Sequence, residues 1–207
     1  WFTAAQNLFV NRDSYIESRH NYYVYHDPHE DRFSPIPWDV NEAFGNFGMG
    51  WTVTQLQRMS PTHNFGHPDY PLITRLLNAS AGPRGRDAYF AHYRDLLETE
   101  WNWVVMGPQV DALQDLIEAD VQADGKKLYS MQFFHDNVTQ DVTIGGGPGG
   151  GPGGGRISCG LKPFVDNRRA YLLGLPEFSR PRPSISGIQV LPDPPGASSP
   201  VLVLAEI

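Results

Sequence analysis

Three polar residues near the start of the chain have types and a spacing that suit chemistry assisted by a metal ion. Asp13, Asn21 and Asp39 lie within the polar stretch Asn11–Gly45. Asn21 and Asp39 offer hard oxygen ligands of the kind that Mg²⁺ takes, an ion that keeps several waters and binds one or two carboxylates. Asp13, eight residues before Asn21, is not needed for the metal and can accept and orient a hydroxyl proton. The pattern predicts magnesium-assisted chemistry at a hydroxyl group.

A β-hairpin is predicted to carry two of these residues. Asn21–Asp27 and Arg32–Val40 are rich in aromatic and β-branched residues, and the turn-forming Pro28–Asp31 joins them. The preceding segment Trp1–Val10 is predicted to be the end of a helix.

The register of this hairpin decides which side chains meet. If the turn is centred on His29–Glu30, paired residue numbers sum to about 59. Asn21 then lies opposite Trp38, and Asp39 follows one step beyond, at the open end. Diagonal neighbours in such a pair are roughly 7–8 Å apart, so we expect Asn21 and Asp39 to share one cation. Asp13 enters from the same end, and the three groups are expected to converge.

Protein kinases divide their chemistry in this way, with a catalytic-loop Asp, an Asn on a metal ion and a later Asp followed by Phe-Gly. Here Phe44 and Gly45 follow Asp39 at a wider spacing. The pattern alone leaves a second interpretation open, in which Asp13 is a turn or cap residue and Asp39 merely ends a strand.

Apolar residues at helical spacing predict helices downstream of the hairpin. The predicted helices are Pro71–Asn78, Arg86–Trp101, Val110–Val121 and Phe164–Leu173, with Asn167–Arg169 of the last one left in solvent. The expected class is therefore α+β, a β-hairpin followed by a helical bundle.

Two short β-rich runs end the chain, Ile185–Leu191 and Val201–Ile207. A linker near Pro181–Pro183 precedes them, because successive prolines favour an extended chain. We expect a first domain over residues 1–180 and the start of a separate β-rich domain over residues 184–207.

Composition excludes several classes of protein. The net charge of −7 argues against binding to nucleic acid through bulk electrostatics. No apolar run approaches the ~20 residues that a membrane span requires. Cys159 is the only cysteine, so no disulfide can form within the chain.

Two further patterns resemble functional motifs but favour plainer interpretations. The tract Gly145–Gly155 is not followed by the Lys of a phosphate-binding loop and contains two prolines, so it is predicted to be a flexible loop or spacer. The pairs His26/His29 and His63/His67 have no third His or Cys to complete a structural metal site.

Several segments, in this order, resemble the spore coat protein H kinase family, the CotH-like kinases. They are "NRD", "HNYYVYHDP", "IPWDVNEAFG", "YPLITRLL", "DAYFAHYRDLLET" and "FVDNRRAYLL". The resemblance extends over roughly residues 1–175, and the first three segments together are specific.

The resemblance implies an atypical protein-kinase-like fold that uses ATP and Mg²⁺ to phosphorylate Ser or Thr of extracellular or surface proteins, in bacteria. Asp13 would then be the catalytic Asp, and Asn21 and Asp39 would be metal ligands. One departure is Asn41, where the family carries a second acid. No Gly-rich nucleotide loop or strand Lys precedes Asp13, so the chain is expected to be the C-terminal catalytic part, completed by the rest of the native polypeptide or a second chain.

An alternative from another class of protein stays open. The resemblance also implies this alternative, because CotH-like domains occur in large extracellular bacterial proteins and as surface adhesins. The chain would then be a structural or adhesive module without phosphotransfer. The acidic balance and the β-rich C-terminal segment fit that alternative.

Overall fold

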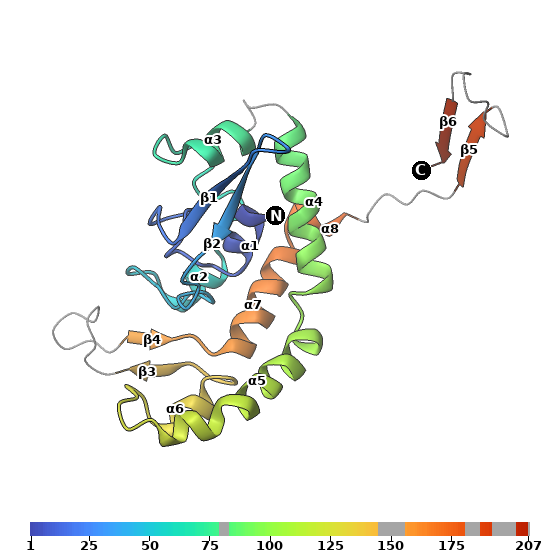
Figure 1. Cartoon of the computed structure of the whole chain (residues 1–207). Coiled ribbons are helices and arrows are strands. Elements are labelled where there is room, and N and C mark those ends of the chain that lie inside the picture. Colours follow the sequence, from blue (N-terminus) through green and yellow to red (C-terminus); the bar gives the residue numbers. More distant parts are fainter. Residues whose placement is uncertain (79–82, 145–155, 181–186, 192–201, 207) are drawn as a thin grey trace. The chain divides into compact units, whose positions relative to one another are not determined.

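The computed structural model describes residues 1–78, 83–144, 156–180, 187–191 and 202–206 (Figure 1). The chain divides into two compact units, Trp1–Gly174 and Leu175–Ile207. In the described part, helices alternate with three separate two-stranded antiparallel sheets. This content agrees with the expected α+β class.

The elements of each unit follow in chain order. The first unit contains α1 (Phe2–Leu8), β1 (Tyr22–Asp27), β2 (Arg32–Pro37), α2 (Val53–Gln57), α3 (Pro71–Leu77), α4 (Pro83–Thr99), α5 (Trp103–Ala123), α6 (Met131–Asp136), β3 (Val142–Ile144), β4 (Arg156–Ser158) and α7 (Leu161–Leu173). The second unit contains α8 (Pro176–Ser179), β5 (Gly187–Leu191) and β6 (Leu202–Glu206).

The hairpin forms in the predicted register. β1 and β2 pair antiparallel from Tyr22 opposite Pro37 to Asp27 opposite Arg32. The Trp38 amide also donates to the Asn21 carbonyl at 3.0 Å, so the predicted Asn21–Trp38 pair extends the ladder. The second strand was expected to reach Val40, but it ends at Pro37. Asp39 has a φ of 47°, a left-handed conformation that cannot continue a strand.

Local signals account for where several helices begin. Pro71 occupies the first turn of α3, where its missing N–H costs nothing. Thr52 and Gln55 form a reciprocal capping box at the start of α2. The Asn102 side chain accepts from the Val104 amide and caps α5, so this helix begins seven residues before the predicted Val110.

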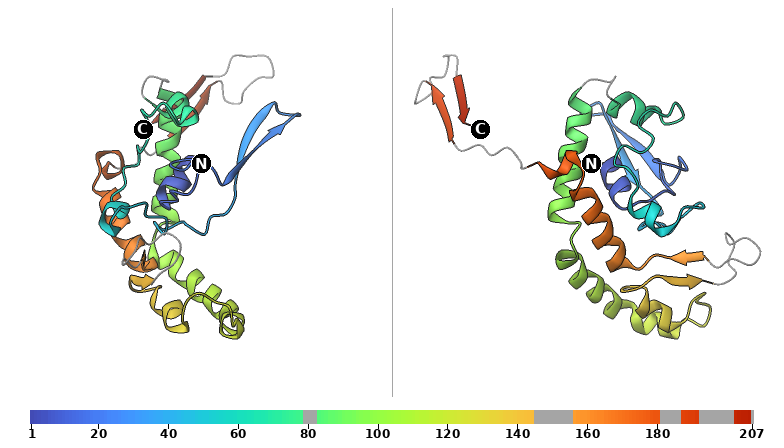
Figure 2. Two further views of the ribbon diagram at one scale, coloured as in Figure 1. Left: turned by 90° about the vertical axis from the view of Figure 1, so that its left-hand side faces the viewer. Right: turned by 180° about the vertical axis from the view of Figure 1, so that it is seen from behind.

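The core of the first unit lies where α1 and α3 contact α4 and where α7 contacts α2 and α5 (Figure 2). Its fully buried side chains come from helices far apart in the sequence: Leu8, Tyr93, Leu97, Phe164 and Leu172, with Trp101 just after α4. Because α1 runs directly into Val10–Asp13, this packing fixes the start of the predicted catalytic segment.

The prediction that Asn167–Arg169 stays in solvent is wrong for Arg168, which is fully buried. Its guanidinium has six acceptors within hydrogen-bond distance, which share its N–H groups: the carbonyls of Asn7, Leu8, Gln57 and Met59 and the side chains of Asn7 and Tyr93. Helix α1 ends at Leu8 and α2 ends at Gln57. The cation therefore lies at the carbonyl ends of two helices, where their dipoles favour positive charge.

In the second unit, β5 and β6 pair antiparallel from Gly187 opposite Glu206 to Leu191 opposite Leu202. Both strands were predicted from their β-rich composition, and the separate β-rich domain they were expected to open stays a prediction. The glycine tract at residues 145–155 and the linker at 181–183 lie outside the described residues. None of the helices in the described part is long and apolar enough to cross a membrane.

Candidate functional site

The segment between α1 and β1 folds back on itself and carries Asp13. The Ser14 hydroxyl donates to the Asn11 carbonyl at 2.6 Å. The Ser18 amide donates to the Arg12 carbonyl at 3.1 Å, and the Arg19 amide to the Ser14 carbonyl at 2.9 Å. These bonds close a compact loop, so Asp13 is held by backbone geometry rather than by a helix or strand.

This loop begins at residues whose conformations cost free energy. Val10 is fully buried and has a φ of 50°, which is a rare conformation for a β-branched residue. Asn11 is also buried, and neither polar atom of its side chain has a hydrogen-bond partner within the described residues. Buried polar groups are normally paired, and backbone strain of this kind gathers at functional sites. The features mark Val10–Asp13 as a candidate functional segment.

The Asp13 carboxylate has partners on both oxygens. Its Oδ2 accepts from the Asn21 amide at 2.8 Å. Its Oδ1 accepts from the Ser18 hydroxyl at 3.2 Å and lies 3.4 Å from the His20 Nε2 atom. The side chain is 17% exposed, so the carboxylate is oriented by three neighbours and still reachable. Each carboxylate oxygen has further lone-pair capacity.

Asn21 links the loop to the hairpin. Its side-chain nitrogen donates to both the carbonyl and the carboxylate of Asp13, each at 2.8 Å. The backbone is left-handed, with a φ of 59°, which Asn tolerates better than most residues. Because both donors point at Asp13, the Oδ1 atom faces away and accepts no hydrogen bond from any described residue. An amide oxygen of this kind can ligate a hard cation.

Asp39 follows the hairpin pair that contains Asn21. Trp38 pairs with Asn21, and Asp39 comes next with an exposed side chain. Within the described ranges, no hydrogen bond or ion pair joins Asp39 to another residue. The structure thus brings Asp13 and Asn21 into direct contact and leaves Asp39 at the same end of the hairpin, without a partner among the described residues. That Asp13 is catalytic and that Asn21 and Asp39 hold a metal stays a prediction.

Sequence reasoning missed the buried cation beside Asp13. Arg12 is 2% exposed and donates to the Gly48 carbonyl. Its guanidinium also lies 3.4 Å from the Glu17 carboxylate and 4.2 Å from the centre of the Trp51 ring. Gly48 and Trp51 belong to the segment after Asp39, so Arg12 connects that segment to the loop that carries Asp13.

Glu17 joins the loop to a second distant segment. His63 Nε2 lies 2.5 Å from the Glu17 carboxylate, and the Tyr70 hydroxyl donates to the Glu17 carbonyl at 2.6 Å. The hydrogen bond from His63 lowers the pKa of Glu17, burial opposes this shift, and the charges of His63 and Arg12 add to it. The position of Arg12 and His20 next to predicted site residues was the available sequence signal. His63 was considered only as one of a pair of possible metal ligands, and no pattern pointed to Glu17.

Phe44 and Gly45 connect the segment after Asp39 to the core. The Phe44 amide donates to the Phe9 carbonyl at 2.6 Å, and its ring packs on those of Phe9 and Trp101. Gly45 has a φ of 72°, and a Cβ atom there would lie 2.9 Å from the Phe164 ring. A larger residue would therefore be strained by its backbone and by its neighbour.

The histidine pairs have other partners. His26 lies 2.8 Å from the Asp31 carboxylate, and His63 binds Glu17. No group of three or more His, Cys, Asp or Glu side chains suited to a metal occurs within the described ranges. The predicted magnesium ligands are one Asn and one Asp, so they would not form a group of this type.

Comparisons with known proteins bear on this geometry. A family model described as CotH kinase protein matches residues 1–144, a range that includes Asp13, Asn21 and Asp39. No curated protein and no solved structure matches the chain.

Proposed function

Because the chain belongs to the CotH kinase protein family, we propose that it acts as an atypical protein kinase. The proposed reaction transfers the γ-phosphate of ATP, in the presence of Mg²⁺, to a Ser or Thr hydroxyl of another protein. We propose further that the fold of the native protein is kinase-like and that its substrates are extracellular or surface proteins of bacteria.

The observation that carries the proposal is the pair of hydrogen bonds from the Asn21 amide to Asp13, each 2.8 Å long. One Asn both orients the carboxylate and leaves its own oxygen available. In protein kinases an Asp is the base and an Asn binds a metal ion, and this contact would position such a base while the Asn oxygen serves the metal.

The residues present fit a magnesium ion. The Asn21 oxygen accepts no hydrogen bond from the described protein, and the exposed Asp39 carboxylate has no ion-pair partner among those residues. Both are hard oxygen donors of the type that Mg²⁺ prefers. When bound, the ion would neutralise charge on the ATP phosphates. In this proposal Asn21 and Asp39 hold it.

In the proposed reaction, Asp13 accepts the proton of the substrate hydroxyl. The substrate hydroxyl oxygen forms a bond to the γ-phosphorus of ATP, the bond to the β-phosphate oxygen breaks, and ADP leaves. The hydroxyl proton passes to the Asp13 carboxylate, which Asn21, Ser18 and His20 hold in one orientation. Fixed orientation of a base is a large part of its catalytic effect.

Asn41 is the feature that favours the alternative, a structural or adhesive module without phosphotransfer. It stands where the family carries a second acid, and its side chain is exposed. One carboxylate fewer near the metal weakens attraction for Mg²⁺. The two functions differ in one measurable property, which is turnover of ATP.

The test is calorimetric titration of the native polypeptide with Mg-ATP, together with an assay for phosphate transfer to protein. We expect Asp39→Ala to abolish metal-dependent ATP binding and transfer while the melting temperature is retained. Asp31→Ala is the matched control, since it removes an acid from the exposed hairpin turn. A folded Asp39→Ala protein with wild-type Mg-ATP affinity would remove Asp39 from the metal site. A native polypeptide without any Mg-dependent turnover would refute the kinase proposal.

A further inference from the structure

The loop that carries Asp13 is held by a segment far away in the sequence. This α2–α3 segment, His63–Leu72, follows α2 and enters the first turn of α3. It donates one hydrogen bond to each of three successive loop residues: from the Leu72 amide to the Tyr15 hydroxyl at 2.9 Å, from the Asn64 side chain to the Ile16 carbonyl at 2.7 Å, and from the Tyr70 hydroxyl to the Glu17 carbonyl at 2.6 Å. The partners are 48 to 57 positions apart, so the conformation of the loop depends on tertiary contacts.

The α2–α3 segment is itself fixed to the core. Just before it, the Ser60 carbonyl accepts from the Asn7 side chain at 3.0 Å, and the Pro61 carbonyl accepts from the Tyr89 hydroxyl at 2.6 Å. Within it, the buried Phe65 ring packs on the Tyr89 ring with centroids 5.2 Å apart. A segment that is packed against the core in this way can hold the loop in one position.

Two ion pairs join the loop to the α2–α3 segment, and one of them is largely buried. His63 Nε2 lies 2.5 Å from Glu17 Oε2, and the two side chains are only 17% and 21% exposed. Hydrogen bonds between charged groups are stronger where water is scarce. The second carboxylate oxygen of Glu17 lies 3.4 Å from the Arg12 guanidinium. His63 and Arg12 therefore hold this carboxylate from two sides.

The position of Glu17 is passed on to Asp13 by two short routes. Arg12, which binds the Glu17 carboxylate, is the residue before Asp13. Ser18 is the residue after Glu17, and its amide donates to the Arg12 carbonyl at 3.1 Å while its hydroxyl donates to Asp13 Oδ1 at 3.2 Å. A displacement of Glu17 would thus move both neighbours of the Asp13 carboxylate.

We propose that His63 is a positioning residue for Asp13. It binds Glu17, and through Arg12 and Ser18 this contact keeps the Asp13 carboxylate in the orientation that accepts a proton. The rate of a reaction depends steeply on the orientation of the groups that take part in it. The proposal rests on the proposed function, since Asp13 must be the base for its orientation to matter.

The plainer interpretation is that the pair of His63 and Glu17 only stabilises the fold. Loss of His63 would then lower the melting temperature, and the contact between Asp13 and Asn21 would be unchanged in molecules that stay folded. The two interpretations therefore differ in the behaviour of Asn21 and in the turnover of the folded variant.

The first measurement needs no turnover. In the native polypeptide with ¹⁵N-labelled asparagine, NMR follows hydrogen exchange of the Asn21 side-chain amide, which donates to the carbonyl and the carboxylate of Asp13 at 2.8 Å each. We expect His63→Leu to speed this exchange at least about tenfold, because a loop that opens more often protects its hydrogen bonds less.

The second measurement is steady-state phosphorylation. His63→Leu should lower kcat about tenfold and leave KM for ATP nearly unchanged, because a misplaced base costs more in the transition state than in the ground state. His63→Gln should recover most of both properties, since its side-chain amide can still donate to the Glu17 carboxylate.

Asp69→Asn is the matched control. It removes the second ion pair between the same two segments, in which Arg19 lies 3.1 Å from Asp69 and the side chains are 51% and 55% exposed. Exposed ion pairs contribute little, so exchange at Asn21 and turnover should stay at wild-type values. Circular dichroism checks folding, and Glu17→Gln replaces His63→Leu if that variant is unfolded.

Three outcomes would overturn the proposal: wild-type exchange at Asn21 in folded His63→Leu, equal acceleration in Asp69→Asn, and faster exchange with unchanged turnover. Failure of the kinase proposal has a different signature, because the wild-type polypeptide itself would then show no Mg-dependent turnover. The exchange measurement alone would in that case decide whether His63 positions Asp13.

Discussion

At the scale of single residues, the candidate site depends on side chains that hold one another. Asn21 fixes Asp13 through two hydrogen bonds. Arg12 binds the segment that follows Asp39, and Glu17 binds His63. We therefore expect separate effects when these groups are removed: loss of Asp13 should affect turnover, and loss of the supporting ion pair should affect stability as well.

Asp13→Asn should lower turnover by about 10²–10⁴-fold, which is the usual contribution of a general base. Affinity for Mg-ATP should stay nearly unchanged, because the base interacts more strongly in the transition state than in the ground state. The measurement is phosphorylation rate alongside melting temperature. Ser18→Ala is the control, since it removes one hydrogen bond to Asp13 and keeps the carboxylate. Wild-type turnover in Asp13→Asn would mean that Asp13 only shapes the turn.

Glu17→Gln should destabilise the protein near neutral pH by about 1–3 kcal/mol, because Arg12 and His63 lose a charged partner. The pKa of Glu17 in the folded protein is lowered below its ordinary value of 4.5. Its stabilisation is therefore fully present above that value and is lost as pH falls through the folded pKa. Urea titrations of both proteins should show the difference in unfolding free energy shrinking at acid pH. A difference that persists undiminished at pH 2 would exclude the carboxylate as its source.

At the scale of elements, the candidate site is positioned by the hairpin, near the start of the first unit, and by α7, near its end. The hairpin places Asp39 one step beyond the Asn21–Trp38 pair. Helix α7 supplies Arg168, whose bonds to Asn7 and Leu8 hold the end of α1, where the predicted catalytic segment begins. Burial raises the pKa of Tyr93 to about 12, against the opposing effect of Arg168, so Tyr93 stays a neutral member of this network.

Arg168→Met should cost about 3–5 kcal/mol of unfolding free energy, because six acceptors around the buried guanidinium lose their donors. Arg168→Lys should recover part of the loss, since an ammonium offers three donors. Arg169→Met is the neighbouring control, because Arg169 bonds only the carbonyls of Leu97 and Trp101 among the described residues. Urea titration measures all three. Equal losses at the two positions would contradict a special role for Arg168.

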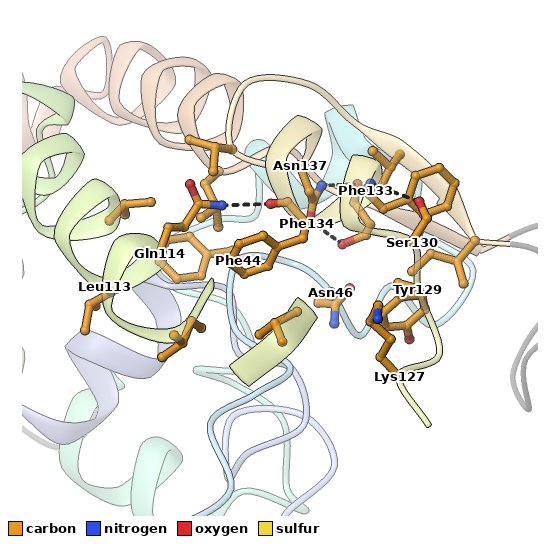
Figure 3. Close-up of a pocket in the computed structure, with 18 of the residues that line it drawn as sticks. Phe44, Asn46, Leu113, Gln114, Lys127, Tyr129, Ser130, Phe133, Phe134 and Asn137 are labelled. Atoms are coloured by element: carbon orange, nitrogen blue, oxygen red, sulfur yellow. Dashed lines mark hydrogen bonds between the residues drawn. The ribbon is translucent and has the colours of Figure 1, made fainter. Parts of the chain in front are cut away.

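At the scale of the whole molecule, the chain separates into two units. The first combines the candidate kinase site with an open, largely apolar groove of about 620 Å³ beside α5, whose lining includes Leu113, Phe133 and Phe134 (Figure 3). The tract at residues 145–155 interrupts this unit between β3 and β4, which pair with each other. Its sequence predicts a spacer, which should tolerate changes of composition at constant length.

Replacement of residues 145–155 by a Gly-Ser linker of equal length should leave stability and any phosphotransfer unchanged, since a spacer contributes only its reach. Melting temperature and phosphorylation rate measure the two properties together. Shortening the linker to two residues is the control, because it changes the reach. A loss of activity beyond about tenfold in the equal-length variant would identify the tract as a functional loop.

The sequence by itself determined the features that depend on neighbours along the chain. The register of the hairpin follows from a turn centred on His29–Glu30, and it was predicted correctly from Tyr22–Pro37 to Asp27–Arg32. The family was recognised from the same local motifs and is supported by the family match over residues 1–144. Both depend on residues that are close together in the chain, so the sequence pattern is enough to predict them.

Only the tertiary structure decided the burial of Arg168, the ion pair of Glu17 with His63, and the groove beside α5. Arg168 binds backbone carbonyls of residues more than 100 positions away. Every residue type has a carbonyl, so no sequence pattern could have identified these acceptors. Glu17 and His63 are 46 positions apart, and their contact depends on how two loops pack. The groove exists because α6 and the β3–β4 pair cover α5 incompletely, a property of the assembled fold.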